Sequence, residues 1–301
     1  MTLETFALAT RARIDMEDDS VLMRRVEMAA WVSDVLRISE DAQRLMPGAG
    51  LCLDGRWLFP TVLADRATIG GESDELLPVR QFPGLLDVLG SLAGGWPQGL
   101  AEDLRVLPVA EGELHAAPGS ELLGARSGRM GPHVHWGSGQ QGFLTAGHVA
   151  PSAGTSVTDT SGAALGSVLW ANDPALAPSA TGDLDAALVA FDPAHSATTG
   201  RASFVAGAGE VLTVAATNQQ AAVLGLFGDV KLGAAQACYA QCYATETRIT
   251  QRGDSGGLVE ARGDVVGTVV GGFVKRDMTL VQAISYQLSE IRRRSGHMVS
   301  L

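Results

Sequence analysis

The sequence predicts a protein of two parts, a small, mainly α-helical domain over residues 1–105 and an all-β domain, a sandwich or barrel, over residues 106–301. Two observations support this division. In the first part apolar residues recur at intervals of three and four, which is the spacing of one helix face. The second part consists of short runs rich in Val, Thr, Leu and Ala, which Gly, Ser, Asn and Asp separate at close intervals. Such runs are typical of β-sandwiches and barrels.

The longest predicted helix begins at Ser20, a plausible N-cap that follows acidic residues, and Pro47 and Gly48 end it. Its apolar face would hold Val21, Met28, Trp31, Val35, Ile38 and Leu45. Shorter segments of the same helical region follow at WLFPTVLAD, residues 57–65, and FPGLLDVLGSLAGG, residues 82–95. The first part therefore reads as a small helical domain.

The second part contains seven clear strand candidates, bounded by turn residues. They are GPHVHW, GFLTAGHV, TSVTDT, GSVLWAN, AALVAF, VLTVAAT and DVVGTVVGGFV. The last segment, VQAISYQLSEIRRR, places Ile284, Leu288 and Ile291 at helical spacing and ends in Arg. Both features favour a carboxyl-terminal helix.

Composition excludes several classes of function. The 301 residues are 46% hydrophobic and 18% charged, which suits a folded globular protein. The formal net charge of -11 argues against binding to nucleic acid or acidic membranes, because both need clustered Lys and Arg. The amino terminus lacks the pattern of a secretory signal, and no apolar run is long enough to span a membrane. Three cysteines do not form the pattern of a secreted disulfide scaffold, so we expect a cytoplasmic protein.

The stretch QRGDSGGLV, residues 251–259, indicates a candidate catalytic serine at position 255. The same letters also suit an ordinary tight turn, because Gly, Asp and Ser promote turn conformations. A nucleophilic serine needs a histidine that takes its proton and a carboxylate that orients the histidine. His148 follows a strand-like run in FLTAGHVA, and Asp185 precedes one in GDLDAALVAF, although Asp183 could serve in its place.

Three motifs in chain order, TAGH, DAAL and GDSGG, resemble those of the trypsin/chymotrypsin-like serine peptidase family, and RGDSGG and VVGTVVGG resemble its compact bacterial members. The resemblance covers roughly residues 115–295 and does not reach the amino-terminal third. It implies a double β-barrel (chymotrypsin-like) fold and a serine endopeptidase that cleaves proteins or peptides through an acyl-enzyme. It assigns Ser255 as nucleophile, His148 as general base and then acid, and Asp185 as the group that fixes the imidazole tautomer.

The resemblance also implies an oxyanion hole formed by the backbone N–H groups of Gly253 and Ser255. Many relatives become active when a newly freed apolar amino terminus pairs with the Asp that precedes the nucleophile, here Asp254. The stretch ATIGGESDE weakly resembles such a terminus, but Ile69 lies too far before His148 in the sequence. We therefore expect Asp254 to find a donor inside the folded chain.

Substrate preference is implied by four positions. Members that prefer Lys or Arg carry Asp six residues before the nucleophile, whereas this chain has Ile249. A hydrophobic or small side chain before the cleaved bond is therefore expected, with Arg252 able to alter this preference. The run VVGG, residues 269–272, would supply the strand that pairs with the substrate backbone, so that Val270 and Gly272 belong to the substrate site.

No metal and no cofactor are expected. His133 and His135 lie on one face of a strand but lack a third ligand at useful spacing. Cys238 and Cys242 have a spacing compatible with metal binding but no second pair, so they are expected to be partly buried thiols.

Two other functions remain open on the sequence. G-x-S-x-G also fits the nucleophile elbow of an α/β-hydrolase, yet that fold needs a helix after the serine, and a strand-like run follows here. A protease-like domain could also bind peptides or scaffold a complex without cleaving anything.

Residues 1–105 would gate the protease or bind a protein partner or activator, an arrangement similar to that of bacterial effector proteases.

Overall fold

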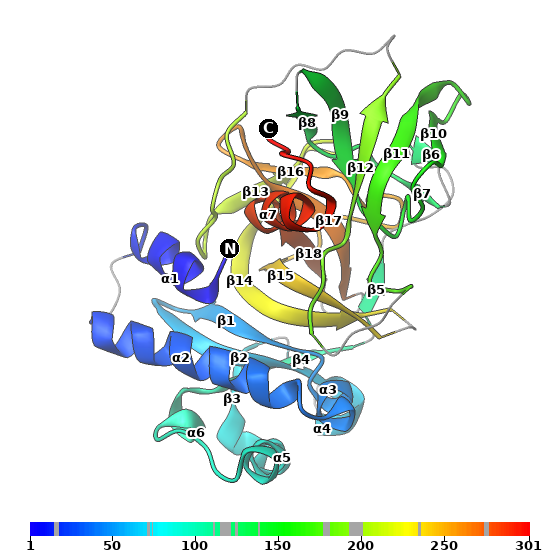
Figure 1. Cartoon of the computed structure of the whole chain (residues 1–301). Helices are drawn as coiled ribbons and strands as arrows, with labels where there is room; N and C mark the ends of the chain where they lie inside the picture. Colours follow the sequence, from blue (N-terminus) through cyan, green and yellow to red (C-terminus); the bar gives the residue numbers. More distant parts are fainter. Residues whose placement is uncertain are drawn as a thin grey trace.

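The computed structural model describes residues 1–14, 18–70, 73, 75–110, 112–114, 122–123, 126–137, 139–176, 181–192, 201–233, 236–273 and 277–301. Over these ranges the chain is mostly β, with an 11-stranded sheet, a 7-stranded sheet and helix α7 (Ile284–Ser295) near the carboxyl end. Figure 1 shows the amino-terminal helices on one side of the larger sheet and the smaller sheet, in green, at its opposite end. No helix within the described ranges is both long enough and apolar enough to cross a membrane.

The 7-stranded sheet bends into a closed ring. Its strands follow the order β7-β6-β10-β11-β12-β9-β8. Their bounds are β6 Leu122–Leu123, β7 Ser127–Gly128, β8 His133–Trp136, β9 Gln140–Thr145, β10 Ser156–Asp159, β11 Ala164–Asn172 and β12 Ala186–Phe191. The two outer members, β7 and β8, belong to one run of chain, residues 127–136. This run pairs with β6 at its start and with β9 at its end, so the ring closes.

A second ring forms the larger part of the 11-stranded sheet. Its strands are β13 Val211–Val214, β14 Gln219–Leu232, β15 Ala237–Thr245, β16 Leu258–Ala261, β17 Asp264–Phe273 and β18 Met278–Ala283. Antiparallel pairing runs in the order β13-β16-β17-β18-β15-β14, and a further pairing of β13 with β14 closes the circle. Two closed antiparallel rings are the double β-barrel that the sequence analysis predicted.

The amino-terminal segment is an α/β layer attached to the second ring. Its elements are α1 Leu3–Arg11, α2 Asp19–Leu36, α3 Glu40–Leu45, β1 Gly48–Asp54, β2 Trp57–Asp65, α4 Arg66–Ile69, β3 Leu77–Pro78, η1 Val79–Gln81, α5 Pro83–Ala93, α6 Leu100–Asp103 and β4 Arg105–Val109. A further short strand, β5 (Gly112–Leu114), pairs with β17. Because β1 hydrogen-bonds β14, the sheet of this segment continues directly into the second ring. The division of the chain at residue 105 stays a prediction, and β4 begins at that residue.

Three details of the predicted amino-terminal helices are wrong. The N-cap of α2 is Asp18, whose side chain accepts a hydrogen bond from the Ser20 N–H, rather than Ser20 itself. Two helices, α2 and α3, occupy the span predicted as one, because Ser39 caps a new helix. WLFPTVLAD forms strand β2 and not a helix. Its residues are buried from Leu58 to Ala64, and such a run gives no periodicity that separates a strand covered on both faces from a helix.

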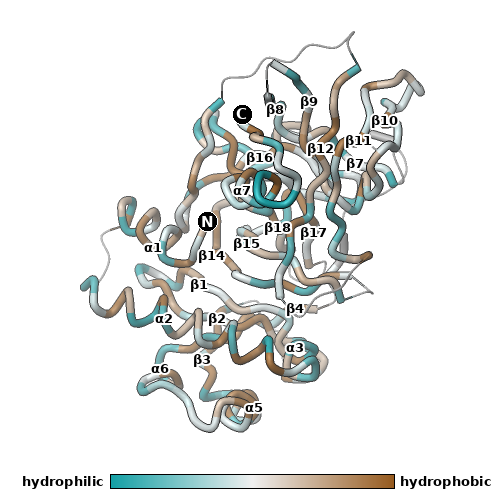
Figure 2. The backbone as a smooth tube through the Cα atoms, in the orientation of Figure 1, coloured by the Kyte–Doolittle hydropathy of each residue, from teal (hydrophilic) through white to brown (hydrophobic). Residues whose placement is uncertain are grey.

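Packing explains why this layer holds together. Helix α2 lies along β1 and β2 (Figure 1), and Val32, Val62, Leu89 and Val106 belong to one buried cluster that joins the helices to the strands. Figure 2 shows mostly hydrophobic residues along α5 and mostly hydrophilic residues along α7. The layer therefore has one hydrophobic cluster of its own, and it shares its sheet and a second cluster, which includes Phe6, Leu22 and Leu51, with the second ring.

Candidate active site

Three side chains from separate parts of the chain form a continuous line of hydrogen bonds. Asp185 Oδ2 lies 2.7 Å from His148 Nδ1, and His148 Nε2 lies 2.8 Å from Ser255 Oγ. The second carboxylate oxygen of Asp185 accepts a hydrogen bond from the backbone N–H of His148 at 3.0 Å. This bond fixes the carboxylate to the backbone that carries the ring. The structure thus brings together the three residues that the motifs indicated.

The site lies between the two rings. His148 follows β9 and Asp185 precedes β12, which are neighbouring strands of the first ring. Ser255 precedes β16 of the second ring. The strand-to-turn change before His148 depends on Gly147, because a Cβ at this position would lie only 1.8 Å from the carbonyl oxygen of Asn172. Glycine alone permits this close approach, which explains why the TAGH motif needs a glycine.

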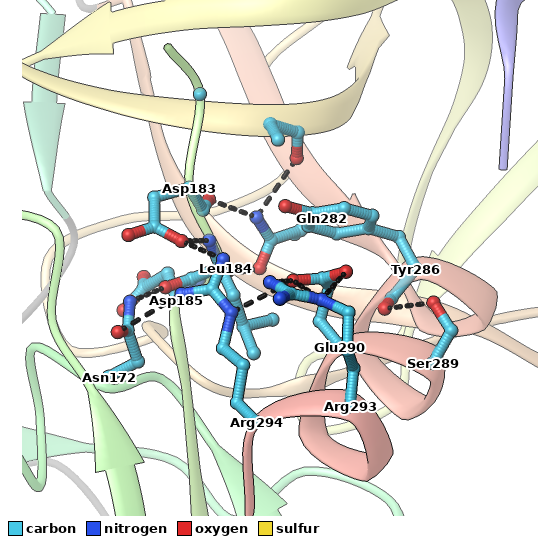
Figure 3. Close-up of polar contacts among 12 residues, drawn as sticks. Asn172, Asp183, Leu184, Asp185, Gln282, Tyr286, Ser289, Glu290, Arg293 and Arg294 are labelled. Atoms are coloured by element: carbon cyan, nitrogen blue, oxygen red, sulfur yellow. Dashed lines mark hydrogen bonds and ion pairs between the residues drawn. The ribbon is translucent and has the colours of Figure 1, made fainter. Parts of the chain in front are cut away.

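Asp183 and Asp185 have different partners, which distinguishes the two candidates for the orienting acid. The carboxylate of Asp183 pairs with Arg294 of α7 at 2.5 Å, and it accepts a hydrogen bond from the Leu184 N–H at 2.7 Å. Figure 3 shows Arg294 and Glu290 of α7 beside this segment. In this structure Asp183 therefore contacts the helix, and Asp185 contacts the imidazole.

Two buried glutamines hold Asp185 in place. Gln282 of β18 accepts a hydrogen bond from the Asp185 N–H at 2.9 Å, and its amide nitrogen donates to the carbonyl oxygens of Asp183 and Ala240 (Figure 3). Gln287 of α7 donates to the Asp185 carbonyl at 3.3 Å. Both glutamines are fully buried. The second ring and α7 thus position the carboxylate that the first ring supplies.

The turn that carries Ser255 has the backbone shape that the sequence indicated. Gly253 has φ +103°, a conformation in which side chains other than glycine are strained. Two consecutive turns shape the loop, through the Asp254 N–H to Gln251 carbonyl bond at 3.1 Å and the Gly257 N–H to Asp254 carbonyl bond at 3.0 Å. Within the described ranges, the N–H groups of Gly253 and Ser255 donate to no backbone carbonyl. Their role as an oxyanion hole stays a prediction.

Asp254 finds its donors inside the folded chain. Its Oδ1 lies 3.2 Å from Nε of Arg129, and its Oδ2 accepts a hydrogen bond from the Gln251 N–H at 2.9 Å. The backbone N–H of Arg129 also donates to the Ser255 carbonyl at 2.8 Å. Arg129 is therefore an internal donor of the kind that the sequence analysis expected for Asp254. Ile69, the terminus considered in the sequence analysis, lies in α4 of the amino-terminal layer.

The four residues expected at the substrate are in unlike environments. Val270 contacts the nucleophile directly, since its carbonyl oxygen lies 3.2 Å from Ser255 Oγ. Gly272 pairs with residue 113 of β5. Ile249 is only 3% exposed and packs in the hydrophobic core, whereas Arg252 is exposed on the loop. Their roles in binding a substrate stay predictions.

The other singled-out side chains have structural contacts. Cys238 and Cys242 are free thiols, and burial raises the pKa of the Cys238 thiol to about 12 and that of Cys242 well above its ordinary value. Burial therefore disfavours the thiolate, which is the nucleophilic form of both side chains. His135 Nε2 lies 2.9 Å from Ser300 Oγ, and His133 packs edge-on against Phe191. These contacts give the two histidines packing roles.

Sequence reasoning missed Arg129, Gln282 and Gln287. The first stands in SGRMGP, which precedes a strand, and the glutamines stand in the segment expected to be helical, of which residues 281–283 belong to β18. No local pattern marks these residues, because each acts through a partner far away in sequence. The expectation of an internal donor for Asp254 was the one available signal.

Comparison with known proteins finds similarity only at the level of structure. No protein-family model and no curated protein matches the chain. Among solved structures, it is similar to Thermobifida fusca protease A at 23% identity and a TM-score of 0.44, covering 61% of this chain and 95% of that one. It is similar to a glutamic-acid-specific serine protease at 19% identity and a TM-score of 0.47, covering 60% and 98%. It is also similar to Nocardiopsis protease at 21% identity and a TM-score of 0.42, covering 60% of this chain and 95% of that one. With its two closed antiparallel rings and carboxyl-terminal helix, the chain has a chymotrypsin-like double β-barrel fold.

Proposed function

We propose that this chain is a serine endopeptidase whose nucleophile is Ser255. The observation that carries the proposal is the line of hydrogen bonds from Asp185 through His148 to Ser255, with distances of 2.7 and 2.8 Å. A serine hydroxyl is a weak nucleophile until an adjacent base removes its proton, and a carboxylate on the far ring nitrogen stabilises the imidazolium that forms. The arrangement meets both requirements, and the proposed substrates are proteins or peptides.

The proposed reaction has two steps. Ser255 Oγ attacks the carbonyl carbon of the scissile peptide while its proton passes to His148 Nε2, and the imidazolium then protonates the leaving amine. Water, deprotonated by the same nitrogen, hydrolyses the acyl-enzyme and regenerates Ser255. The N–H groups of Gly253 and Ser255 would donate to the oxyanion. Loss of one such donor typically lowers turnover about 100-fold to 1,000-fold.

The binding assignments belong to the same proposal. Backbone atoms of Val270 and Gly272 would pair with the substrate strand, and the apolar Ile249 argues against a preference for Lys or Arg. Control by residues 1–105 or by a partner that binds them also stays a proposal, which the pairing of β1 with β14 supports because it connects the two parts. A cytoplasmic location and an effector role remain hypotheses from the sequence. Equal activity and partner binding after deletion of residues 1–105 would contradict the regulatory proposal.

The test is cleavage of an unbiased peptide library, read by mass spectrometry, with Ser255→Ala and His148→Ala as the comparison chains. The expected result is a set of new peptide termini that appears with the unaltered chain and disappears with either variant. Cleavage that persists with Ser255→Ala would assign the activity to another residue or to a contaminant. A chain that binds peptides but cleaves none of them would favour a protease-like binding module.

A further inference from the structure

Strand β17 has two edges, and one of them passes directly beside the nucleophile. Strand β18 pairs along the first edge, from Gly267 to Phe273. Along the second edge, β16 pairs with the earlier part of β17, up to Thr268. The turn after Ser255 comes next, with the Gly256 N–H donating to the Val269 carbonyl at 2.8 Å. The second edge therefore leads from β16 to the nucleophile turn.

Strand β5 continues this second edge immediately beyond the nucleophile. The Val270 carbonyl lies 3.2 Å from Ser255 Oγ. The next residues of β17 pair antiparallel with β5, in the register Gly271 with Leu114, Gly272 with Glu113 and Phe273 with Gly112. Since the pairing is antiparallel, the chain of β5 runs from Phe273 toward Val270, that is, toward Ser255.

This edge of residues 269–272 is the one expected to pair with the backbone of a substrate. We propose that β5 occupies the substrate-strand site, so that the chain's own residues 112–114 are a tethered peptide ligand that competes with substrates. The inference rests on the proposed function for its meaning, because it concerns regulation of the same site. The burial of the site agrees with it, since His148 and Ser255 are both 0% exposed.

The contacts of Gly112 explain why this segment fits and provide a means to displace it. A Cβ at Gly112 would lie 2.4 Å from Leu232 Cδ2 and 3.0 Å from Phe273 Cε1. The carbonyl oxygen of Gly112 also accepts a hydrogen bond from the Gly233 N–H at 3.2 Å. A branched side chain at position 112 requires either the buried side chains of Leu232 and Phe273 or β5 itself to move. Gly112→Val is therefore expected to release β5 without changing a residue of the proposed catalytic machinery.

A tethered strand competes strongly because it is always present near its site. Short tethers give effective concentrations of about millimolar or more. A free peptide then binds only to the fraction of molecules in which the edge is open, and its apparent affinity falls by that fraction. If β5 is paired in at least about nine molecules of ten, its release strengthens peptide binding by about tenfold or more.

The test measures peptide binding separately from catalysis. A fluorescent peptide with the sequence EGELHA, residues 111–116, is titrated against full-length chains that all carry Ser255→Ala. One chain has no further change, and the others add Gly112→Val or Glu113→Pro. A fourth adds Gly84→Val as a matched control, because a Cβ at Gly84 meets nothing within 4 Å. Thermal unfolding of each chain verifies that it is folded.

The expected result is binding at least about tenfold tighter with Gly112→Val and Glu113→Pro than with the parent or the Gly84→Val control. Equal binding by all four folded chains would overturn the proposal that β5 fills the site. Labelling of Ser255 by a fluorophosphonate, measured on the same variants with Ser255 restored, tests the peptidase separately. Tighter peptide binding without any labelling would leave the role of β5 standing and contradict the proposed peptidase.

Discussion

The ion pair between Arg129 and Asp254 gives the sharpest prediction about what holds the nucleophile turn. Asp254 is 1% exposed, and its carboxylate has Arg129 and the Gln251 N–H as partners. Substitution Arg129→Met keeps most of the side-chain volume but leaves the buried carboxylate without its counter-charge. Removing one partner of a buried ion pair typically costs about 3–5 kcal/mol. The Arg129 side chain is 28% exposed, so we expect a value of about 3 kcal/mol, at the lower end.

Arg293→Met is the matched control, because Arg293 also pairs with an acid, Glu290, but its side chain is 64% exposed. An exposed helical pair of this kind contributes about 0.3–0.5 kcal/mol. Both variants are compared by urea unfolding in the Ser255→Ala background, which prevents self-digestion. A free energy of unfolding lowered equally by the two substitutions would refute the reasoning.

The same substitution should also lower reactivity at Ser255. Arg129 holds Asp254, which lies between the two residues whose N–H groups would form the oxyanion hole. If the turn loses the orientation of one donor, turnover falls about 100-fold or more. With Arg129→Lys, which restores a positive charge, part of the activity should return. Unchanged turnover with Arg129→Met would show that the turn keeps its shape without the ion pair.

Three further predictions concern the surroundings of the site. His148→Ala should lower peptide hydrolysis by about 10⁴-fold or more, measured as kcat, and a smaller loss would exclude it as general base. Gln282→Leu leaves the Asp185 N–H without an acceptor, so it should cost about 2 kcal/mol in urea unfolding and lower kcat more than it raises KM. Burial raises the pKa of Asp173, whose Oδ2 has no hydrogen-bond partner within the described ranges. A raised pKa means that the folded chain binds this proton more tightly than the unfolded chain. The cost is therefore fully present above the folded pKa and disappears as pH falls below the ordinary value of 3.8. Asp173→Asn should raise the urea midpoint at pH 7 and lose this advantage in acid, and an equal gain at both pH values would contradict the assignment.

Patterns local in the sequence predicted the elements that depend on local chemistry. The alternation of apolar and polar residues predicted β8, and the apolar run after Asp185 predicted β12. Helical spacing of Ile284, Leu288 and Ile291 placed α7. The motifs also indicated which His, Asp and Ser would lie together, because each combines its functional residue with the small residues that its turn requires.

Contacts between residues far apart in the chain could not be predicted from the sequence. Strand β2 carries apolar residues on both faces, so its periodicity could not separate it from a helix, and only its pairing with β1 and β4 reveals a sheet. Strand β5 is too short to give any pattern. The motifs assigned Asp185 as the orienting acid, but they could not show what Asp183 contacts, because its partner Arg294 lies more than 100 positions away in the chain.

Fluorophosphonate labelling of the full-length chain that carries Gly112→Val, with the adduct located by mass spectrometry, tests the central claim most directly. The account predicts a single adduct on Ser255, which disappears with Ser255→Ala and is strongly slowed by His148→Ala. The unaltered chain should react more slowly than Gly112→Val because β5 fills the site. A folded Gly112→Val chain that forms no adduct, or forms one on another residue, would contradict the assignment of Ser255 as an activated nucleophile.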